Sequence, residues 1–259
     1  MAIELILVPY VLGREGVGMG AGPLALREVA EEVLRPAVVT RVALSAPFGN
    51  EVGACFDLNR QVAAEVAAAA GRGALPVVMT GNCHTQQAVV AGLGGGADGL
   101  GLVWFDCHAD FHTPETTTSG FFDGQGLSMT VGHCWAELCA TVPGFEPVAE
   151  ERVVLVGARD VDAGEEERLA ASRIVRSAAA HAPAKRVSLH LDLDVLDPDT
   201  VGRANAYATP GGMSADALTA AVRSVDGVAA VTISAYDPAH DATGGVRDAL
   251  RQVLRALAA

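Results

Sequence analysis

Short, almost uninterrupted apolar runs alternate along this chain with longer stretches of helical character, several of them rich in alanine. The apolar runs predict strands over residues 1–8, 77–79, 102–105, 153–156, 187–193 and 228–233, and the longer stretches predict helices over 23–34, 58–70, 85–93, 165–171, 216–225 and 246–257. Strands that are apolar throughout have both faces covered, which is typical of parallel sheets with helices on each side. The alternation therefore indicates an α/β fold built around a parallel sheet.

Composition and length favour one folded domain over residues 1–259. Half of the 259 residues are hydrophobic and 19% are charged, whereas a disordered chain combines few apolar residues with a high charge density. The apolar runs are shorter than the ~18 residues of a membrane-spanning helix. The N-terminal run carries Glu4 and lacks the basic region of a signal peptide, so we interpret it as the first strand.

Charge and cysteine content narrow the partners and the compartment. The formal net charge of −13, from 31 acidic and 18 basic residues, argues against binding to nucleic acid or to an anionic membrane surface. The five cysteines are odd in number and scattered, which is not a disulfide framework and fits a reducing cytoplasm. We therefore expect a cytoplasmic protein whose partner is a small molecule.

Three segments concentrate metal-ligating residue types, and each follows an apolar run: 80–85, 104–114 and 190–198. The carboxyl ends of parallel strands meet at one edge of a sheet, so these segments are expected to lie together. Because side chains of an extended chain alternate faces, Asp106, His108 and Asp110 are expected to point the same way. The same reasoning places Asp192 and Asp194 on one face.

Such a group of acids and imidazoles is unfavourable at the ends of buried strands unless a cation compensates the charge. The predicted ligands are His84, Asp106, His108, Asp110, Asp192 and Asp194. Four carboxylates and two imidazoles suit Mn²⁺ better than Zn²⁺, and they are too many for one ion, so two ions are expected. Taken singly, His84 could instead be a capping or core histidine, and the acids near 192 could be solvated strand-end residues.

The motifs in these three segments resemble those of the ureohydrolase (arginase/agmatinase) superfamily. The resemblance is carried by Gly81-Asn-Cys-His84, by Asp106-Cys-His-Ala-Asp110 with 113–120, and by Asp192-Leu-Asp194-Val-Leu-Asp197-Pro198, with weaker matches over 20–27 and 157–165. It implies a three-layer α/β/α fold with a central eight-stranded parallel sheet, two Mn²⁺ ions, and assembly into trimers or hexamers.

The resemblance also implies how the ligands divide between the ions. One ion would take His84, Asp106, Asp110 and Asp192, and the other would take Asp106, His108, Asp192 and Asp194. Two cations lower the pKa of a water between them, so that hydroxide is available to attack an amidine or guanidine carbon at neutral pH. Asp110 would carry the proton to the leaving amine.

Departures from the family pattern bear on the substrate. Ala235 stands where the family has a glutamate that pairs with a guanidinium, and Asp123 stands where it has a histidine. We hypothesise that Asp123 takes over part of the recognition or catalysis, with Tyr236 as a weaker candidate. Cys83 replaces a family aspartate, and it would either support a ligand without touching the metal or be a small buried hydrophobe.

The residues implied to bind the amino-acid end of the substrate match the family pattern better. Ser119 matches a residue that binds the substrate carboxylate, and Asp162 and Glu165 match residues around the α-amino group, although both could instead cap a helix. His112 stands where an asparagine is usual, and an imidazole can still donate to a carboxylate.

The predicted function is therefore that of a binuclear manganese hydrolase of linear C–N bonds. Its substrate would be N-hydroxy-L-arginine or L-arginine, giving ornithine with hydroxyurea or urea. A hydroxyguanidine is less basic than a guanidine, which relaxes the need for the missing glutamate. One alternative is the same chemistry on a formimidoyl, ureido or other guanidino substrate, and another is a metal-stabilised binding protein without turnover.

Overall fold

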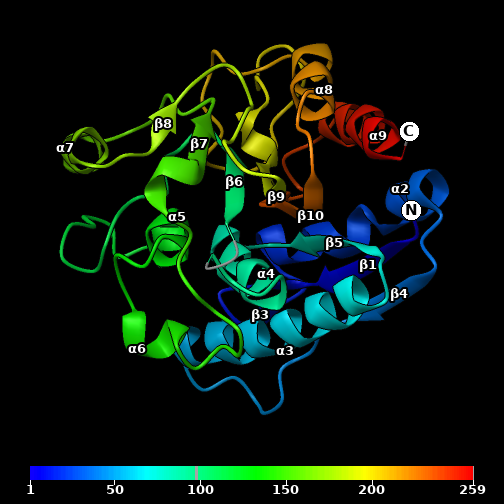
Figure 1. The fold of residues 1–259 in the computed structure, drawn as a ribbon. Coiled ribbons are helices and arrows are strands. Elements are labelled where there is room, and N and C mark those ends of the chain that lie inside the picture. The colour runs from blue at the N-terminus through cyan, green and yellow to red at the C-terminus, as the bar shows by residue number, and fades with distance from the viewer. Residues whose placement is uncertain (97–98, 259) are drawn as a thin grey trace.

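The computed structural model describes residues 1–96 and 99–258, so residues 97, 98 and 259 of the predicted domain lie outside the described part. Eight parallel strands form one sheet in the order β4-β1-β5-β10-β9-β6-β7-β8 (Figure 1). The strands are β1 (Ile3–Val8), β4 (Val38–Arg41), β5 (Leu75–Thr80), β6 (Leu100–Phe105), β7 (Val153–Val156), β8 (Val175–Arg176), β9 (Arg186–Asp192) and β10 (Val228–Ser234). A hairpin of β2 (Tyr10–Val11) and β3 (Arg14–Glu15) lies apart from this sheet.

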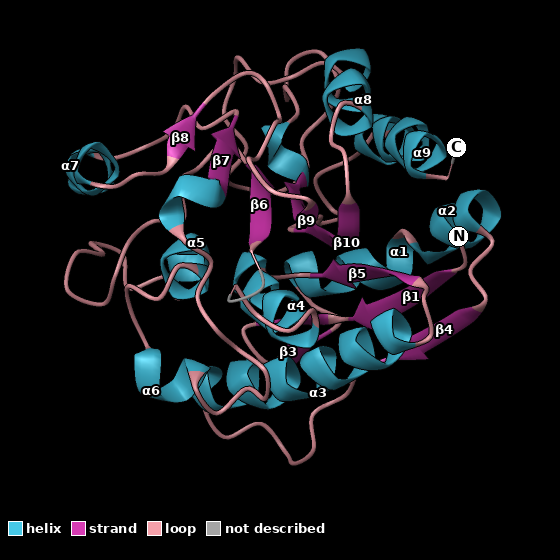
Figure 2. Ribbon diagram, viewed as in Figure 1, coloured by secondary structure: helices cyan, strands magenta, loops and turns pink. Residues whose placement is uncertain are grey.

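Helices cover both faces of the sheet, because successive strand residues supply two separate cores. In β1, Ile6 packs in the core that contains Val62 of α3, whereas Leu5 packs in the core that contains Leu250 of α9. The first face is covered by α3 (Glu51–Gly71), α4 (Gln86–Gly92) and α5 (Gly126–Thr130), and the second by α2 (Arg27–Leu34), α8 (Ala215–Arg223) and α9 (Gly245–Leu257) (Figure 2). The predicted three-layer α/β/α architecture and its eight-stranded parallel sheet are confirmed.

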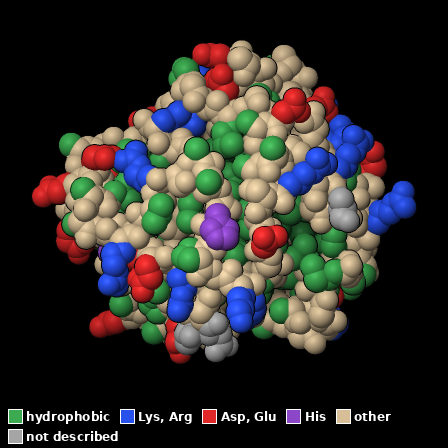
Figure 3. All heavy atoms as spheres, turned by 45° about the horizontal axis from the view of Figure 1, so that its top comes forward, with side chains coloured by type: hydrophobic (Ala, Val, Ile, Leu, Met, Phe, Trp, Pro, Cys, Tyr) green, Lys and Arg blue, Asp and Glu red, His purple; other side chains and the backbone are tan. Residues whose placement is uncertain are grey.

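The described part of the chain also contains α1 (Gly22–Ala25), α6 (Ala136–Cys139) and α7 (Ala163–Ala171), the last beyond the β8 edge of the sheet (Figure 1). Among the described residues, no helix is long and apolar enough to cross a membrane. On the face drawn in Figure 3, acidic and basic side chains are interspersed among hydrophobic ones.

Some boundaries differ from the predicted ones for local physical reasons. The predicted helix over 23–34 is interrupted at Leu26, which separates α1 from α2. The helix predicted over 58–70 begins earlier, at Glu51, because the Asn50 side chain accepts a hydrogen bond from the Gly53 amide and caps its first turn. Strands β4 and β8 were not predicted, since one is largely exposed and the other has only two residues.

The four central strands β5, β10, β9 and β6 end at one edge of the sheet, where all three metal-type motifs leave it. The extended chain expected from Asp106 to Asp110 and from Asp192 to Asp194 does not continue past the strand ends. Strand β6 ends at Phe105, and Asp194 lies in a 3₁₀ turn over Leu193–Val195. Instead, the chain forms tight turns in which an aspartate side chain accepts a hydrogen bond from the amide two residues later. The His108 amide donates to Asp106 at 2.7 Å, and the Asp194 amide donates to Asp192 at 2.8 Å. These tight turns bring alternate side chains together without a strand.

Candidate metal centre

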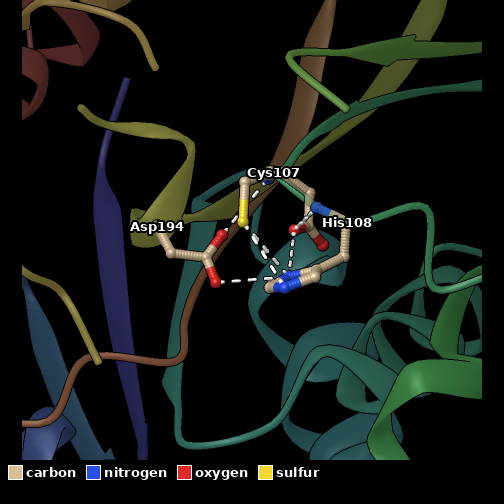
Figure 4. A group of neighbouring side chains, drawn as sticks. Cys107, His108 and Asp194 are labelled. Atoms are coloured by element: carbon tan, nitrogen blue, oxygen red, sulfur yellow. Dashed lines mark hydrogen bonds and ion pairs between the residues drawn. The ribbon is translucent and has the colours of Figure 1, made fainter. Parts of the chain in front are cut away.

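One group of potential ligands comprises Asp106, Cys107, His108 and Asp194, whose ligand atoms all lie within 4.8 Å of one another. His108 Nδ1 is 3.3 Å from Asp106 Oδ1 and 3.4 Å from Asp194 Oδ2. The Cys107 amide donates to Asp194 Oδ1 at 3.2 Å, so the loop after β6 and the turn after β9 hold each other in place (Figure 4).

A second group shares Asp106 with the first and adds Cys83 and His190, again within 4.8 Å. Cys83 comes from the loop after β5, and its Sγ is 2.9 Å from Oδ2 of Asp192. The structure therefore brings residues of all three motifs to one place. His190 begins the third segment but was not among the predicted site residues, although its spacing of two residues from Asp192 places it on the same face of the strand.

Buried polar groups donate hydrogen bonds to the carboxylates and hold them in place. Trp104 Nε1 donates to Asp106 Oδ2 at 3.0 Å, and the indole stacks on the His190 ring with centroids 3.7 Å apart. Asn205 Nδ2 donates to Asp194 Oδ2 at 3.2 Å and to the carbonyl of Ala235 at 2.9 Å. Asn205 was missed by the sequence analysis, since it lies in a loop outside the three motifs.

The raised pKa values of three buried aspartates indicate an excess of buried negative charge. Burial, and then the charge of Asp106, raises the pKa of Asp110 well above its usual range. Burial, and then Asp194, does the same for Asp192 and raises the pKa of Asp106 to about 6. Although burial disfavours its charged form, hydrogen bonds to Asp106 and Asp194 raise the pKa of His108. These shifts mean that positive charge is stabilised at this place, as the binding of a divalent cation requires.

A cavity of about 650 Å³ opens over these carboxylates. Its lining includes Cys83, His108, Asp110, Asp192 and Asp194 on the metal side. It also includes His112, Ser119, Asp123, Asp160, Asp162, Glu165, Asn205, Tyr207 and Ala235. Most of the predicted site residues therefore share one cavity.

The wall of the cavity carries a third group, made of His112, Asp162 and Glu165. His112 Nε2 lies 3.0 Å from Asp162 Oδ2 and 3.7 Å from Glu165 Oε2. The other oxygen of Asp162 caps α7 by accepting from the amides of Gly164 (2.8 Å) and Glu165 (3.0 Å). The capping and the site interpretations of Asp162 are thus compatible, because each uses a different oxygen.

His84 is placed differently from the other predicted ligands. It belongs to neither carboxylate group and does not appear among the described residues that line the cavity. Its ring packs edge-on against Phe122 with centroids 5.1 Å apart, and both ring nitrogens are buried without a hydrogen-bond partner. Its neighbour Cys83 occupies the position facing the aspartates.

Two residues predicted to bind substrate, Asp123 and Tyr236, are hydrogen-bonded to other groups of the protein. Asp123 lines the cavity, but its oxygens accept from Asn82 Nδ2 at 2.8 Å and from the His84 amide at 2.9 Å. The Tyr236 hydroxyl donates to Asp241 Oδ2 at 3.0 Å, and Tyr236 is absent from the described cavity lining.

A sequence model of the arginase family matches residues 1–258 of this chain. The chain belongs to the arginase family. The arginase of Bacillus caldovelox is 30% identical over 230 residues, which are 76% of this chain and 77% of that relative. The predicted ureohydrolase resemblance is thereby confirmed.

Solved structures of the arginase family have the same fold. The arginase of Bacillus cereus superposes with a TM-score of 0.87 at 22% identity, covering 99% of this chain and 98% of the other. A formimidoylglutamase from Bacillus subtilis superposes with a TM-score of 0.75 at 16% identity, covering 99% of this chain and 86% of the other. At these identities the likeness concerns the fold alone.

Proposed function

We propose that this chain is a binuclear manganese hydrolase that cleaves a linear C–N bond in a guanidino-type amino acid. N-hydroxy-L-arginine or L-arginine would give ornithine with hydroxyurea or urea. The observation that carries the proposal is a single cavity with buried carboxylates and His108 on one side and the His112, Asp162 and Glu165 group on its wall. The relatives named arginase support the reaction class.

The donor set fits two hard divalent ions. Asp106, His108, Asp110, Asp192 and Asp194 would hold them, with a sixth donor from either His84 or Cys83. Carboxylates predominate in this set, which favours Mn²⁺ over Zn²⁺. When bound, two such ions supply the positive charge that makes water a nucleophile near neutral pH.

Asp110 is placed to hold and pass on a proton. Its carboxylate faces the cavity, and burial raises its pKa well above the usual range, so it accepts a proton more readily than an exposed aspartate. Its backbone adopts a left-handed conformation with φ of 49°. The amides of Leu127 (3.0 Å) and Ser128 (3.2 Å) donate to its carbonyl and keep this conformation in place.

The wall that carries His112, Asp162 and Glu165 would bind the amino-acid end of the substrate. Asp162 and Glu165 offer negative charge for an ammonium group, and Ser119 offers a hydroxyl for a carboxylate. His112 lies against both acids and adds a donor beside them. The cavity thus offers polar groups beside the metal ligands and on this wall to orient an elongated substrate.

Ala235 bears on the choice between arginine and N-hydroxyarginine. It lines the cavity with a methyl group and offers no carboxylate to pair with a guanidinium. A hydroxyguanidine is less basic and carries less positive charge near neutral pH, so the missing carboxylate costs it less binding energy. We therefore place N-hydroxyarginine first. The same feature favours a formimidoyl, ureido or other guanidino compound as the second candidate class.

Ornithine release from Mn²⁺-loaded protein tests the proposal, with arginine and N-hydroxyarginine offered side by side and bound metal counted. Preferential turnover of N-hydroxyarginine supports the argument from Ala235. Preference for arginine would mean that another group, with Asp123 first in line, anchors the guanidinium. No ornithine from either compound, with two ions bound, would exclude this substrate class and direct the test to formimidoyl and ureido compounds.

The cellular setting and the assembly complete the proposal. All five cysteines are free and buried, which supports a reducing cytoplasm. Assembly into a trimer or hexamer remains a prediction from the resemblance. Light scattering on the purified chain gives the mass of the assembly directly.

A further inference from the structure

We propose that the loop after β5 ligates metal through the Cys83 thiolate rather than through the His84 imidazole. The inference rests on the metal centre of the proposed function and specifies its sixth ligand. It makes this centre a mixed site in which one sulfur joins an otherwise oxygen-rich donor set.

The position of Cys83 carries the argument. Its Sγ lies 2.9 Å from Asp192 Oδ2, and it forms a group within 4.8 Å with ligand atoms of Asp106 and His190. Cys83 also lines the cavity over the aspartates, although it is only 3% exposed. A sulfur in this position touches Asp192 and lies within 4.8 Å of Asp106, and both carboxylates are among those proposed to hold the ions.

The local backbone gives His84 another direction. Cys83 and His84 begin a 3₁₀ turn over Cys83–Thr85, where successive side chains point about a third of a turn apart. The His84 amide donates to Asp123 at 2.9 Å, which holds this orientation. The His84 ring packs against Phe122. Cys83 therefore faces the aspartates, whereas His84 faces Phe122.

A second observation comes from the groups behind Cys83. Ser234 Oγ lies 3.3 Å from Cys83 Sγ and 3.3 Å from His190 Nε2, so these three form a buried chain of polar atoms. The remaining nitrogen of His190, Nδ1, is buried without a partner, and the residue is fully buried. The Ser234 hydroxyl can therefore donate a hydrogen bond to the sulfur once Cys83 is bound to a metal, as the supporting partners of metal ligands commonly do.

The rival ligand, His84, also has unpartnered ring nitrogens, so the two assignments must be separated by experiment. Cys107 provides a matched control, because its Sγ groups with Asp106 and Asp194 but lies 3.3 Å from His108 Nδ1, and Cys107 is not among the described residues lining the cavity. On metal binding, the Cys83 S–H bond breaks, its proton passes to solvent, and the sulfur donates its electron pair to the metal.

The test uses the full chain loaded with Co²⁺, whose thiolate complexes absorb by charge transfer in the near ultraviolet. Wild-type protein, Cys107→Ser and His84→Gln are expected to show this band with bound cobalt. Cys83→Ser is expected to lose it while its thermal unfolding remains cooperative. A thiolate also raises the preference for cobalt over manganese, so Cys83→Asp is expected to shift the competition toward manganese.

Retention of the band in Cys83→Ser, or its loss in Cys107→Ser alone, would overturn the assignment. So would wild-type protein with two cobalt ions and no band, or loss of bound metal in His84→Gln but not in Cys83→Ser. If Cys83→Ser fails to fold, X-ray absorption of the metal-loaded wild type and Cys107→Ser still decides, because a sulfur neighbour must remain in both. Failure of the wild type to retain any divalent ion would instead refute the proposed metal centre itself.

Discussion

The Cys83 thiol and the Asp192 carboxylate are 109 positions apart in the chain, yet they meet at 2.9 Å in the floor of the cavity. They follow β5 and end β9, which are separated in the sheet by β10. Ser234, the last residue of β10, lies between them with its hydroxyl 3.3 Å from the thiol. The site is therefore assembled from the ends of adjacent parallel strands, whose order the crossovers determine.

Removal of divalent metal is expected to lower the stability of the fold. Without cations the buried aspartates are desolvated and repel one another, and both effects raise the pKa values of Asp110 and Asp192. At a hundredfold excess of ion over its Kd, binding stabilises the native state by ~2.7 kcal/mol. Thermal unfolding with Mn²⁺ and then with excess chelator measures this difference. An unchanged Tm, with metal release verified, would contradict the placement of the ions among these acids.

Ala235→Glu is expected to shift specificity toward L-arginine. A carboxylate at this position can form a charge-assisted hydrogen bond to a guanidinium, worth ~1.5–3 kcal/mol, or about tenfold and more in the ratio of kcat/KM values. Ala235 already has a positive φ of 59°, so a larger side chain adds no new backbone strain. Ala235→Gln has the same shape without the charge and serves as the control. Equal ratios for both variants would exclude an electrostatic origin.

Asn205→Ala is expected to weaken metal binding by disturbing Asp194. The change removes a donor to Asp194 Oδ2 and the acceptor for the amides of Tyr207 and Ala208. Leaving the buried members of this set, Asp194 Oδ2 and the Ala208 amide, without these partners costs ~1–3 kcal/mol. Metal affinity from calorimetry and the free energy of unfolding should both fall. If only stability changes, Asn205 holds its loop and has no effect on the ligand.

Asp123→Asn tests whether this carboxylate recognises substrate or holds the loop after β5. Both oxygens accept hydrogen bonds, from Asn82 and from the His84 amide, and an amide group can satisfy only one of these donors. We expect lower stability and lower metal affinity from the disturbed loop, together with a lower kcat/KM. An unchanged kcat/KM for the true substrate in Asp123→Ala would refute its hypothesised role in recognition.

The pair formed by Glu4 and Arg72 is expected to make stability depend on pH in the acid range. Arg72 donates to both oxygens of Glu4, at 2.8 and 2.6 Å, and this hydrogen bonding lowers the pKa of Glu4 in spite of burial. Because the folded pKa lies below the unfolded one, the stabilisation is present at neutral pH and disappears as pH falls through the folded pKa. Arg72→Gln should therefore lower Tm at pH 7 and converge with wild type in acid.

The exposed pair of Arg27 and Glu31, one turn apart on α2, provides the control for this prediction. Exposed pairs of this kind contribute little to stability. Arg27→Gln should leave Tm almost unchanged at both pH values. An effect as large as that of Arg72→Gln would mean that the loss of any arginine, rather than the burial of Glu4, lowers stability.

Local pattern was sufficient to predict several elements and the general place of the site. The run over 77–79 lies within β5, and those over 102–105 and 153–156 lie within β6 and β7, because strands buried on both faces must be apolar throughout. The start of α3 could not be predicted from apolar spacing alone, since the Asn50 cap determines it. The edge strand β4 is largely exposed and so lacks the apolar signal.

By itself, the sequence determined which residue types are available for metal binding and that they follow apolar runs, because residue type, apolar pattern and chain position are local properties. Only the tertiary structure decided that Cys83 rather than His84 faces Asp192, and that Asn205 and His190 support the carboxylates. These choices depend on how a tight turn packs against Phe122 and on which strands become neighbours. Both follow from contacts between segments far apart in the chain, which residue spacing does not encode.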